Sequence, residues 1–170
     1  DYDNRREEYD WANEMSDERL LRLIDECAEL GVKEILISGN GEPMTRANTI
    51  LEMMKKMKSH GIIGGLTTNG PLFTEEMTKE IVKIGYDRIN VSLQSPDEET
   101  QDKIRKSKGS LKRNIKFFSW LKKWKEYYKT DKPILAIAPV TYTSNYKQIF
   151  ELFKFAKEHG VSQVYAAPIK

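Results

Sequence analysis

The chain has 170 residues, of which 39% are hydrophobic and 32% are charged, and its formal net charge is +2. This length and balance favour a single globular domain and exclude a disordered chain. The near-neutral charge provides no overall field that would attract nucleic acid or an acidic membrane surface. No apolar run approaches the length needed to span a membrane, so we expect a cytoplasmic protein.

The sequence contains one cysteine, Cys27. A single cysteine excludes an intrachain disulfide and any metal site built from several cysteines of this chain. Cys27 lies on the apolar face of a predicted helix, where we expect a buried structural thiol.

The predicted elements alternate between amphipathic helices and short apolar strands. After a predicted loop over residues 1–15, apolar side chains recur at helical spacing from Ser16, the expected N-cap, to Gly31, the expected end. In the fourth helix Ser95 is the expected N-cap, and a break is expected at Gly109. The predicted helices cover residues 16–31, 47–61, 74–85, 95–128 and 146–160, and the predicted strands cover 34–38, 62–68, 88–93, 134–140 and 163–167.

Alternation of helices with buried strands is typical of a parallel sheet that has its helices on the outside. Five such units are fewer than the eight of a complete barrel, and the order begins on a helix and ends on a strand. We therefore predict an α/β fold, a partial parallel (β/α)6-type TIM-like barrel that lacks its first strand, with residues 1–170 as one domain. In such folds ligands bind beyond the carboxyl ends of the strands.

Small and polar residues follow four of the predicted strands. These segments are SGNGEPMTR (38–46), TTNG (67–70), SLQS (92–95) and APVTYTSN (138–145). Such residues occur in many strand-to-helix turns, but their presence at four strand ends favours a binding site. In the first segment, the carboxylate of Glu42 and the peptide groups around Gly39 and Gly41 could hold an ammonium group.

These motifs resemble the core domain of radical S-adenosylmethionine (radical SAM) enzymes. GNGEP is similar to the family's GGEP-type motif, and TTNG is similar to its TNG turn. Residues 91–115 resemble the family segment that contains SLDG and NI. The motifs follow the family's order and spacing, and the resemblance covers the chain from about Ser16 to its end.

The resemblance implies two cofactors, SAM and a [4Fe–4S] cluster. In the family the missing first strand precedes a CxxxCxxC motif whose thiolates hold the cluster, and we expect that motif upstream of Asp1 in the natural protein. The cluster donates an electron to SAM, and the resulting 5′-deoxyadenosyl radical abstracts a hydrogen atom from the substrate. A reductant such as flavodoxin or ferredoxin is implied as a partner.

The resemblance also assigns cofactor-binding residues. The first loop would hold the SAM amine, while Ser92 and Arg105 would hold the carboxylate and the ribose, with Arg113 as a weaker rival to Arg105. Gln94 stands where the family often has Asp. Val140 and Ala166 could pack on the adenine, although both are more readily explained as core residues. The candidates are Gly39, Asn40, Gly41, Glu42, Pro43, Thr68, Asn69, Ser92, Gln94, Arg105 and Val140.

The substrate is not fixed by these motifs. A peptide is favoured because this core pattern is common among peptide-modifying members, and a small molecule or RNA stays possible. The basic stretch 103–132 could suit RNA, but its aromatic residues recur at helical spacing, which predicts an amphipathic outer helix. Two alternative functions are a phosphate-handling barrel lyase or isomerase with Lys170 as Schiff-base residue, and a non-catalytic SAM-binding scaffold.

Overall fold

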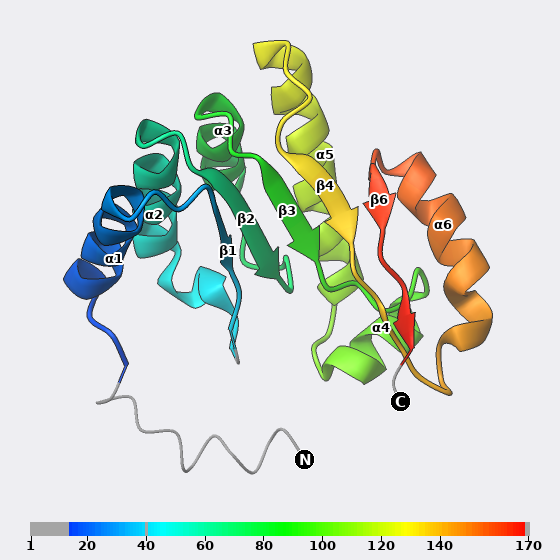
Figure 1. Ribbon diagram of the computed structural model, residues 1–170. Coiled ribbons are helices and arrows are strands. Elements are labelled where there is room, and N and C mark those ends of the chain that lie inside the picture. Colours follow the sequence, from blue (N-terminus) through cyan, green and yellow to red (C-terminus); the bar gives the residue numbers. More distant parts are fainter. Residues whose placement is uncertain (1–13, 40, 169–170) are drawn as a thin grey trace.

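The computed structural model describes residues 14–39 and 41–168 (Figure 1). Within these residues, five parallel strands form one sheet in the order β1-β2-β3-β4-β6, and β5 pairs with β7 in a second, two-stranded sheet. The elements in chain order are α1 (Asp17–Glu29), β1 (Glu34–Ile37), η2 (Pro43–Arg46), α2 (Ala47–Ser59), β2 (Ile63–Thr68), α3 (Glu75–Lys83), β3 (Arg88–Val91), α4 (Glu98–Arg105), α5 (Ser110–Tyr128), β4 (Ile134–Ile137), β5 (Val140–Thr141), η3 (Tyr146–Gln148), α6 (Ile149–Glu158), β6 (Gln163–Val164) and β7 (Ala167–Pro168).

The predicted fold class is confirmed. Each long crossover between neighbouring strands contains a helix, which is the connection that parallel strands require. Figure 1 shows the helices along the outside of the twisted sheet and all strands of the main sheet pointing the same way. The loops that follow the strands therefore gather at one edge, as the ligand-binding edge of an α/β barrel requires.

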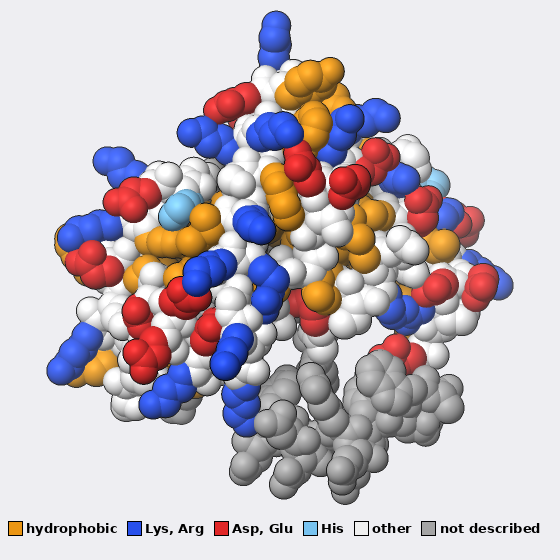
Figure 2. All heavy atoms as spheres, turned by 180° about the vertical axis from the view of Figure 1, so that it is seen from behind, with side chains coloured by type: hydrophobic (Ala, Val, Ile, Leu, Met, Phe, Trp, Pro, Cys, Tyr) orange, Lys and Arg blue, Asp and Glu red, His pale blue; other side chains and the backbone are white. Residues whose placement is uncertain are grey.

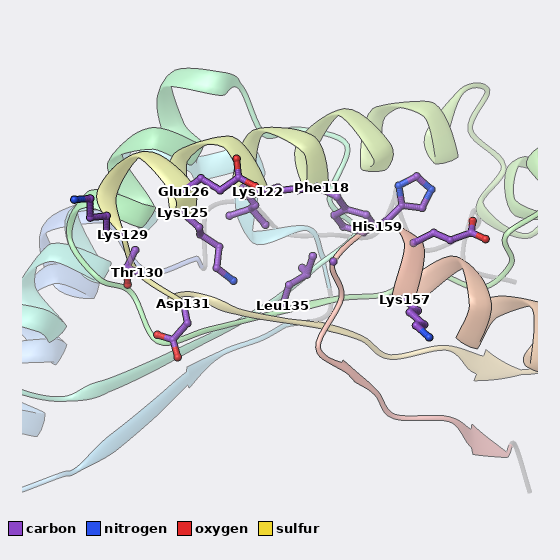
Figure 3. Close-up of a pocket in the computed structure, with 13 residues that line it drawn as sticks. Phe118, Lys122, Lys125, Glu126, Lys129, Thr130, Asp131, Leu135, Lys157 and His159 are labelled. Atoms are coloured by element: carbon purple, nitrogen blue, oxygen red, sulfur yellow. The ribbon is translucent and has the colours of Figure 1, made fainter.

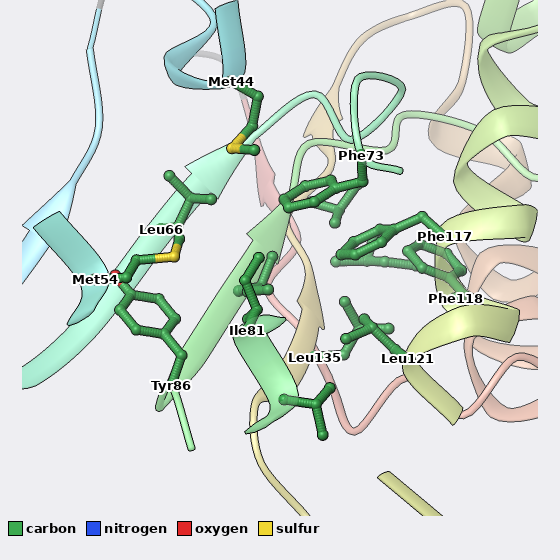
Figure 4. Packing of buried hydrophobic residues seen from close by; sticks show 14 of the residues in the cluster. Met44, Met54, Leu66, Phe73, Ile81, Tyr86, Phe117, Phe118, Leu121 and Leu135 are labelled. Atoms are coloured by element: carbon green, nitrogen blue, oxygen red, sulfur yellow. The ribbon is translucent and has the colours of Figure 1, made fainter. Parts of the chain in front are cut away.

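The core lies between the sheet and its helices (Figure 4). Along β3, Ile89 and Val91 are fully buried, whereas Asn90 between them is only half-buried. This alternation follows from the pleat of a strand, which turns successive side chains to opposite faces. Helix α5 supplies Phe117 and Phe118 to the same core.

The N-cap predicted for the fourth helix is wrong. Helix α4 begins at Glu98, and its N-cap is Asp97, whose Oδ1 accepts a 2.9 Å hydrogen bond from the backbone N–H of Thr100. The Oγ of Ser95 accepts from the Asp97 N–H and donates to Oε1 of Gln148, so this side chain stabilises the preceding turn instead. The expected break near Gly109 is confirmed, because α4 ends at Arg105 and α5 begins at Ser110.

The last two predicted strands are each divided in two. Strand β4 pairs with β6, and after a short interruption β5 pairs with β7. Pro139 lies in the interruption and has no N–H to donate to a ladder. The next N–H, that of Val140, donates to the side chain of Gln94 at 2.6 Å.

The amphipathic interpretation of the basic stretch is confirmed for α5. Leu111, Phe118 and Leu121 are buried, whereas the lysines of this helix are mostly exposed. On the face opposite to that of Figure 1, basic and acidic side chains are interspersed (Figure 2). Cys27 is half-buried rather than buried, because it lies at the margin of the apolar face of α1. Of the predicted opening loop, only Glu14 and Met15 are described, and both are non-helical.

Candidate functional site

The loops that follow β1, β2 and β3 meet at the carboxyl edge of the sheet. Glu42 from the first loop is hydrogen-bonded to Thr68 and Asn69 from the end of the second strand. The third loop joins through Ser92, whose backbone N–H donates to the carbonyl of Thr68 at 2.8 Å. The fourth segment joins the third, since the Val140 N–H donates to Oε1 of Gln94 at 2.6 Å. All four predicted polar segments are thus linked by hydrogen bonds, which the sequence order alone does not require.

The side chain of Glu42 accepts three hydrogen bonds at this edge. Its Oε1 accepts hydrogen bonds from the backbone N–H of Met44 at 3.0 Å and from the hydroxyl of Thr68 at 2.6 Å. Its Oε2 accepts from the backbone N–H of Asn69 at 2.5 Å. Glu42 is also the N-cap of η2, which begins at Pro43, a residue whose fixed φ suits the first turn of a helix. The carboxylate is therefore held in one orientation from two loops.

Thr68 and Asn69 have different tasks in this arrangement. Thr68 is buried, and besides donating to Glu42 its Oγ1 accepts from the Gly70 N–H at 3.0 Å. The hydroxyl proton of Thr68 is thus committed to Glu42, and Thr68 supports that carboxylate. Asn69 bonds Glu42 through its backbone, and its half-buried side chain makes no hydrogen bond to the described residues. The Asn69 carboxamide is therefore free for a ligand.

Arg105 brings a positive charge to the same edge from the end of α4. Its Nη2 donates to the carbonyl oxygen of Ser92, while its Nε is buried and has no hydrogen-bond partner within the described residues. Burial lowers the pKa of the Arg105 guanidinium, and the nearby carboxylate of Glu42 opposes that shift. A buried N–H without a partner is costly, so this guanidinium is suited to an additional acceptor such as a carboxylate. Arg113, its rival in the sequence, is exposed and donates to the Oγ of Ser107.

Ser92 and Gln94 lie on the loop after β3. The Ser92 hydroxyl is half-buried and has no hydrogen bond within the described part of the chain. The carboxamide of Gln94 is already engaged, since its Oε1 accepts from the Val140 N–H at 2.6 Å and its Nε2 lies 3.5 Å from the Ser92 carbonyl. The structure therefore gives Gln94 a bridging position between the loop after β3 and β5.

The prediction that Val140 and Ala166 are core residues is wrong. Val140 is half-buried and Ala166 is exposed, because both lie where the main sheet gives way to the β5–β7 pair. Val140 is fixed through its backbone, as its carbonyl accepts from Nδ2 of Asn145 at 3.0 Å. Its side chain is thus available at the carboxyl edge.

The glycines of the first loop are open to their surroundings. A Cβ on Gly39 or Gly41 would meet no described atom within 4 Å, and neither residue has a positive φ. Packing inside the described chain therefore does not require glycine at either position, and the absence of a side chain leaves the backbone there accessible. Asn40, the candidate between them, lies outside the described residues, as does Lys170 of the alternative lyase hypothesis.

Two residues of this edge were not singled out from the sequence. Gln101 is fully buried in α4, and its Oε1 accepts from the backbone N–H groups of Gln94 and Ser95 at 2.9 and 3.1 Å. Asn145 is also fully buried, and its Nδ2 donates to the Gln94 carbonyl at 2.9 Å. A polar residue on the inward face of a predicted helix was the available signal for Gln101. The contact of Asn145 with Gln94 spans 51 residues of sequence, so no local signal predicted it.

No group of three or more potential metal ligands occurs among the described residues. The whole chain has one cysteine, half-buried on α1, so its residues do not fit an iron-sulfur cluster. Among the described residues, the carboxyl edge thus carries charged groups of both signs, Glu42 and Arg105, and no cluster of metal ligands.

A cavity of about 480 Å³ lies at the opposite edge, between the ends of α5 and α6 (Figure 3). Its floor contains Phe118, Leu121 and Leu135, and lysines and acidic residues surround it. The residues that precede β4 and β6 form this cavity, so it is separate from the site at the carboxyl ends of the strands.

A family model described as the radical SAM superfamily matches residues 3–156. AdoMet-dependent heme synthase of Methanosarcina barkeri is 32% identical over 149 residues, which cover 88% of this chain and 40% of that protein. A probable GTP 3′,8-cyclase of Thermococcus kodakarensis is 38% identical over 92 residues, which cover 54% of this chain and 29% of that protein. The chain thus spans less than half the length of these relatives.

The fold is also similar to that of Streptococcus suis SuiB, solved with S-adenosylmethionine and with its precursor peptide SuiA. The TM-score is 0.75 at 23% identity, and the match covers 93% of this chain and 35% of the SuiB chain in the complex with S-adenosylmethionine. At this identity the likeness concerns the fold. Together with the family match, it supports S-adenosylmethionine and a [4Fe–4S] cluster as the cofactors, the cluster by resemblance.

Proposed function

This chain belongs to the radical SAM superfamily, and from that premise we propose that its carboxyl edge binds SAM for reductive cleavage to a 5′-deoxyadenosyl radical. The observation that carries the proposal is the placement of Glu42 and Arg105 at one edge of the sheet. The methionyl end of SAM carries an ammonium and a carboxylate, and this edge offers one group of opposite charge for each. When bound, SAM would supply the radical that abstracts a hydrogen atom from the substrate.

The chain's own residues would divide the recognition of SAM among the three loops. Glu42, held by Thr68 and Asn69, would accept the ammonium, and the open backbone around Gly39 and Gly41 would allow its close approach. Arg105 would use for the carboxylate its buried Nε, which has no partner in the part of the chain that the structure describes.

The remaining candidates would contact the nucleoside. The free side chains of Asn69 and Ser92 would hydrogen-bond to the ribose, and the half-exposed Val140 would pack on the adenine. Gln94 would contribute mainly by holding the backbone of Val140 against the loop after β3.

The [4Fe–4S] cluster would be ligated by cysteines outside this chain. Open-site ligation of such a cluster needs three thiolates, and the chain offers one. We therefore propose that residues 1–170 contribute the SAM-binding part of a larger radical SAM core domain, which receives its electron from a carrier such as flavodoxin or ferredoxin. A cytoplasmic location is proposed, and the described residues contain no helix able to span a membrane.

A peptide is the proposed substrate class. The support is the likeness in fold to SuiB, which has been solved with its precursor peptide SuiA. The names of the two sequence relatives point instead to heme and GTP chemistry, so a small molecule is the second candidate. Formation of 5′-deoxyadenosine that rises on addition of a candidate substrate would identify the class.

Anaerobic calorimetric titration of SAM into the full-length natural protein tests the binding proposal. Glu42→Gln and Arg105→Ala each remove a charge-assisted contact of about 1.5–3 kcal/mol, so the dissociation constant is expected to rise by about 10- to 100-fold. The exposed Glu99 and Arg113 provide matched controls, and Glu99→Gln and Arg113→Ala should bind SAM like the wild type. Equal affinity in all four variants would contradict the site.

A further inference from the structure

Asn114 is a fully buried amide without hydrogen-bond partners. It lies in the second turn of α5, and neither its Nδ2 nor its Oδ1 has a partner among the described residues. Leaving a buried polar group unpaired destabilises the folded state. An aliphatic side chain of similar shape would avoid this cost, so packing within the core does not explain an amide at this position.

The amide of Asn114 lies directly against Gly70, in the turn that follows β2. A Cβ built on Gly70 would be 1.9 Å from Oδ1 of Asn114, and the next side chain, that of Val91, would be 3.2 Å away. Gly70 also has a φ of +91°, which disfavours any other residue. A carbonyl oxygen tolerates closer contact with a backbone Cα–H than a methyl group does. The amide thus allows α5 and this turn to approach more closely than an aliphatic side chain would.

The turn that Asn114 supports lies between α5 and Glu42. The N–H of Asn69 donates to Oε2 of Glu42, and the N–H of Gly70 donates to the Thr68 hydroxyl that bonds Oε1. Both oxygens of the carboxylate therefore depend on where this turn lies.

A second contact fixes the other end of the same segment to α5. The rings of Phe73 and Phe117 are stacked, with centroids 4.0 Å apart and planes at 7° (Figure 4). Asn114 and Phe117 are three residues apart and thus neighbours on the helix surface. Helix α5 consequently holds residues 70–73 at two points.

We infer that Asn114 is a positioning residue for the SAM site: its carbonyl oxygen sets the approach of Gly70 to α5 and so keeps Asn69 and Thr68 on Glu42. The inference rests on the proposed function, in which Glu42 accepts the SAM ammonium. It deepens that proposal because it places a determinant of SAM affinity in a helix that does not touch the ligand.

Two single substitutions of Asn114 and a double-mutant cycle in the full-length natural protein test the inference through SAM affinity. Asn114→Leu removes the unpaired groups but places methyl groups against Gly70, so thermal stability should be retained while the dissociation constant rises about tenfold, equivalent to about 1.4 kcal/mol. Asn114→Asp keeps the shape, and a buried carboxyl without a counter-charge has a raised pKa. The ratio of the SAM dissociation constant of Asn114→Asp to that of the wild type should therefore be near one at pH 5.5, where the carboxyl is protonated. The ratio should increase toward pH 8.5 as the carboxyl ionises.

A double-mutant cycle provides the third readout. Gly70→Ala alone should weaken SAM binding because the new Cβ collides with Oδ1, and Asn114→Ala in the same chain should restore part of the loss. Circular dichroism is used to check that each variant is folded. If Asn114→Leu does not fold, the single variant Asn114→Ala is measured in its place.

The outcomes separate the inference from the proposed function. The role of Asn114 would be overturned, with SAM binding intact, by three results together. These are a wild-type SAM dissociation constant for Asn114→Leu, a dissociation-constant ratio for Asn114→Asp that does not change with pH, and no recovery of affinity when Asn114→Ala is added to Gly70→Ala. A wild-type protein that does not bind SAM would contradict the proposed function and the inference with it.

Discussion

The hydroxyl of Thr68 donates a 2.6 Å hydrogen bond to Oε1 of Glu42, across 26 residues of sequence. This contact joins the end of β2 to the loop after β1, and together with the Asn69 N–H it fixes the carboxylate that we propose as the ammonium acceptor. Glu42 is half-buried, so the orientation of its carboxylate is set by these partners and not by solvent.

Replacing Thr68 by valine should weaken SAM binding without unfolding the protein. The substitution keeps the shape but removes the hydrogen bond to the charged Glu42 and the one accepted from the Gly70 N–H. The loss of the charged contact, about 1.5–3 kcal/mol, should raise the SAM dissociation constant about 10-fold or more. Thr130→Val is the matched control, because Thr130 also accepts a backbone hydrogen bond, from Lys132, but at the other edge of the sheet. If both variants bind SAM with wild-type affinity, the Thr68 contact is not needed for the site.

Asn145 should be essential to the stability of the carboxyl edge. It is fully buried, its Nδ2 donates to the carbonyls of Gln94 and Val140, and its Oδ1 accepts from the Tyr142 N–H at 2.6 Å. Asn145→Ala leaves these buried backbone groups without a partner, so the free energy of unfolding should fall by about 3 kcal/mol. Chemical denaturation of this variant beside Asn48→Ala, an exposed position in α2, measures the difference. A loss as small as that of Asn48→Ala would mean that water replaces these bonds.

Asp87 should contribute stability that disappears in acid. It is buried at the start of β3, where Lys58, Lys132 and the Gly64 N–H bond its carboxylate. Burial favours the protonated acid, but the two lysines and the Gly64 N–H outweigh it, so the pKa of Asp87 is lowered. A lowered folded-state pKa means that the stabilisation is complete above the ordinary pKa of about 4 and is lost as the pH falls through the folded-state value.

The corresponding measurement is urea denaturation of Asp87→Asn and wild type from pH 7 downward. Breaking this buried ion-pair cluster should cost about 3 kcal/mol at neutral pH, and the difference should stay constant to about pH 5 and narrow below pH 4. Asp131→Asn, an exposed position, should show little loss at any pH. If the difference in the free energy of unfolding between Asp87→Asn and wild type did not change in acid, the ionised carboxylate of Asp87 would not be the source of the stabilisation.

The fold could be predicted from the sequence wherever local signals decide it. Ser16 is the N-cap of α1 as predicted, because a cap hydrogen bond depends only on residues three positions away. Thr74, the first residue of the predicted helix 74–85, caps α3 in the same way. Ser95 has the same local pattern but bonds Gln148, 53 residues further on, and Asp97 becomes the cap. The contact of Ser95 with Gln148 thus favours Asp97 over Ser95 as the N-cap of α4. A contact between residues so far apart cannot be predicted from the local sequence.

In the candidate site, too, some features could be predicted from local sequence and others depend on distant contacts. The motif around Glu42 was readable as residue types at a strand end. Arg105 was assigned only through the family resemblance, because the predicted fourth helix ran past it to residue 128, and only the structure places it at the end of α4. The support of the site was not readable, because the contacts of Thr68 with Glu42, of Gln94 with Val140, and of Asn114 with Gly70 join segments that meet only in the folded chain.

The central claim is that this chain carries the SAM site of a radical SAM enzyme. Anaerobic iron-sulfur reconstitution of the full-length natural protein, followed by EPR of the reduced form with and without SAM, tests it most directly. We predict a four-iron signal that changes on addition of SAM in the wild type and changes far less in Glu42→Ala. A protein that forms no cluster, or a cluster signal indifferent to SAM, would contradict the claim and favour a non-catalytic scaffold with this fold.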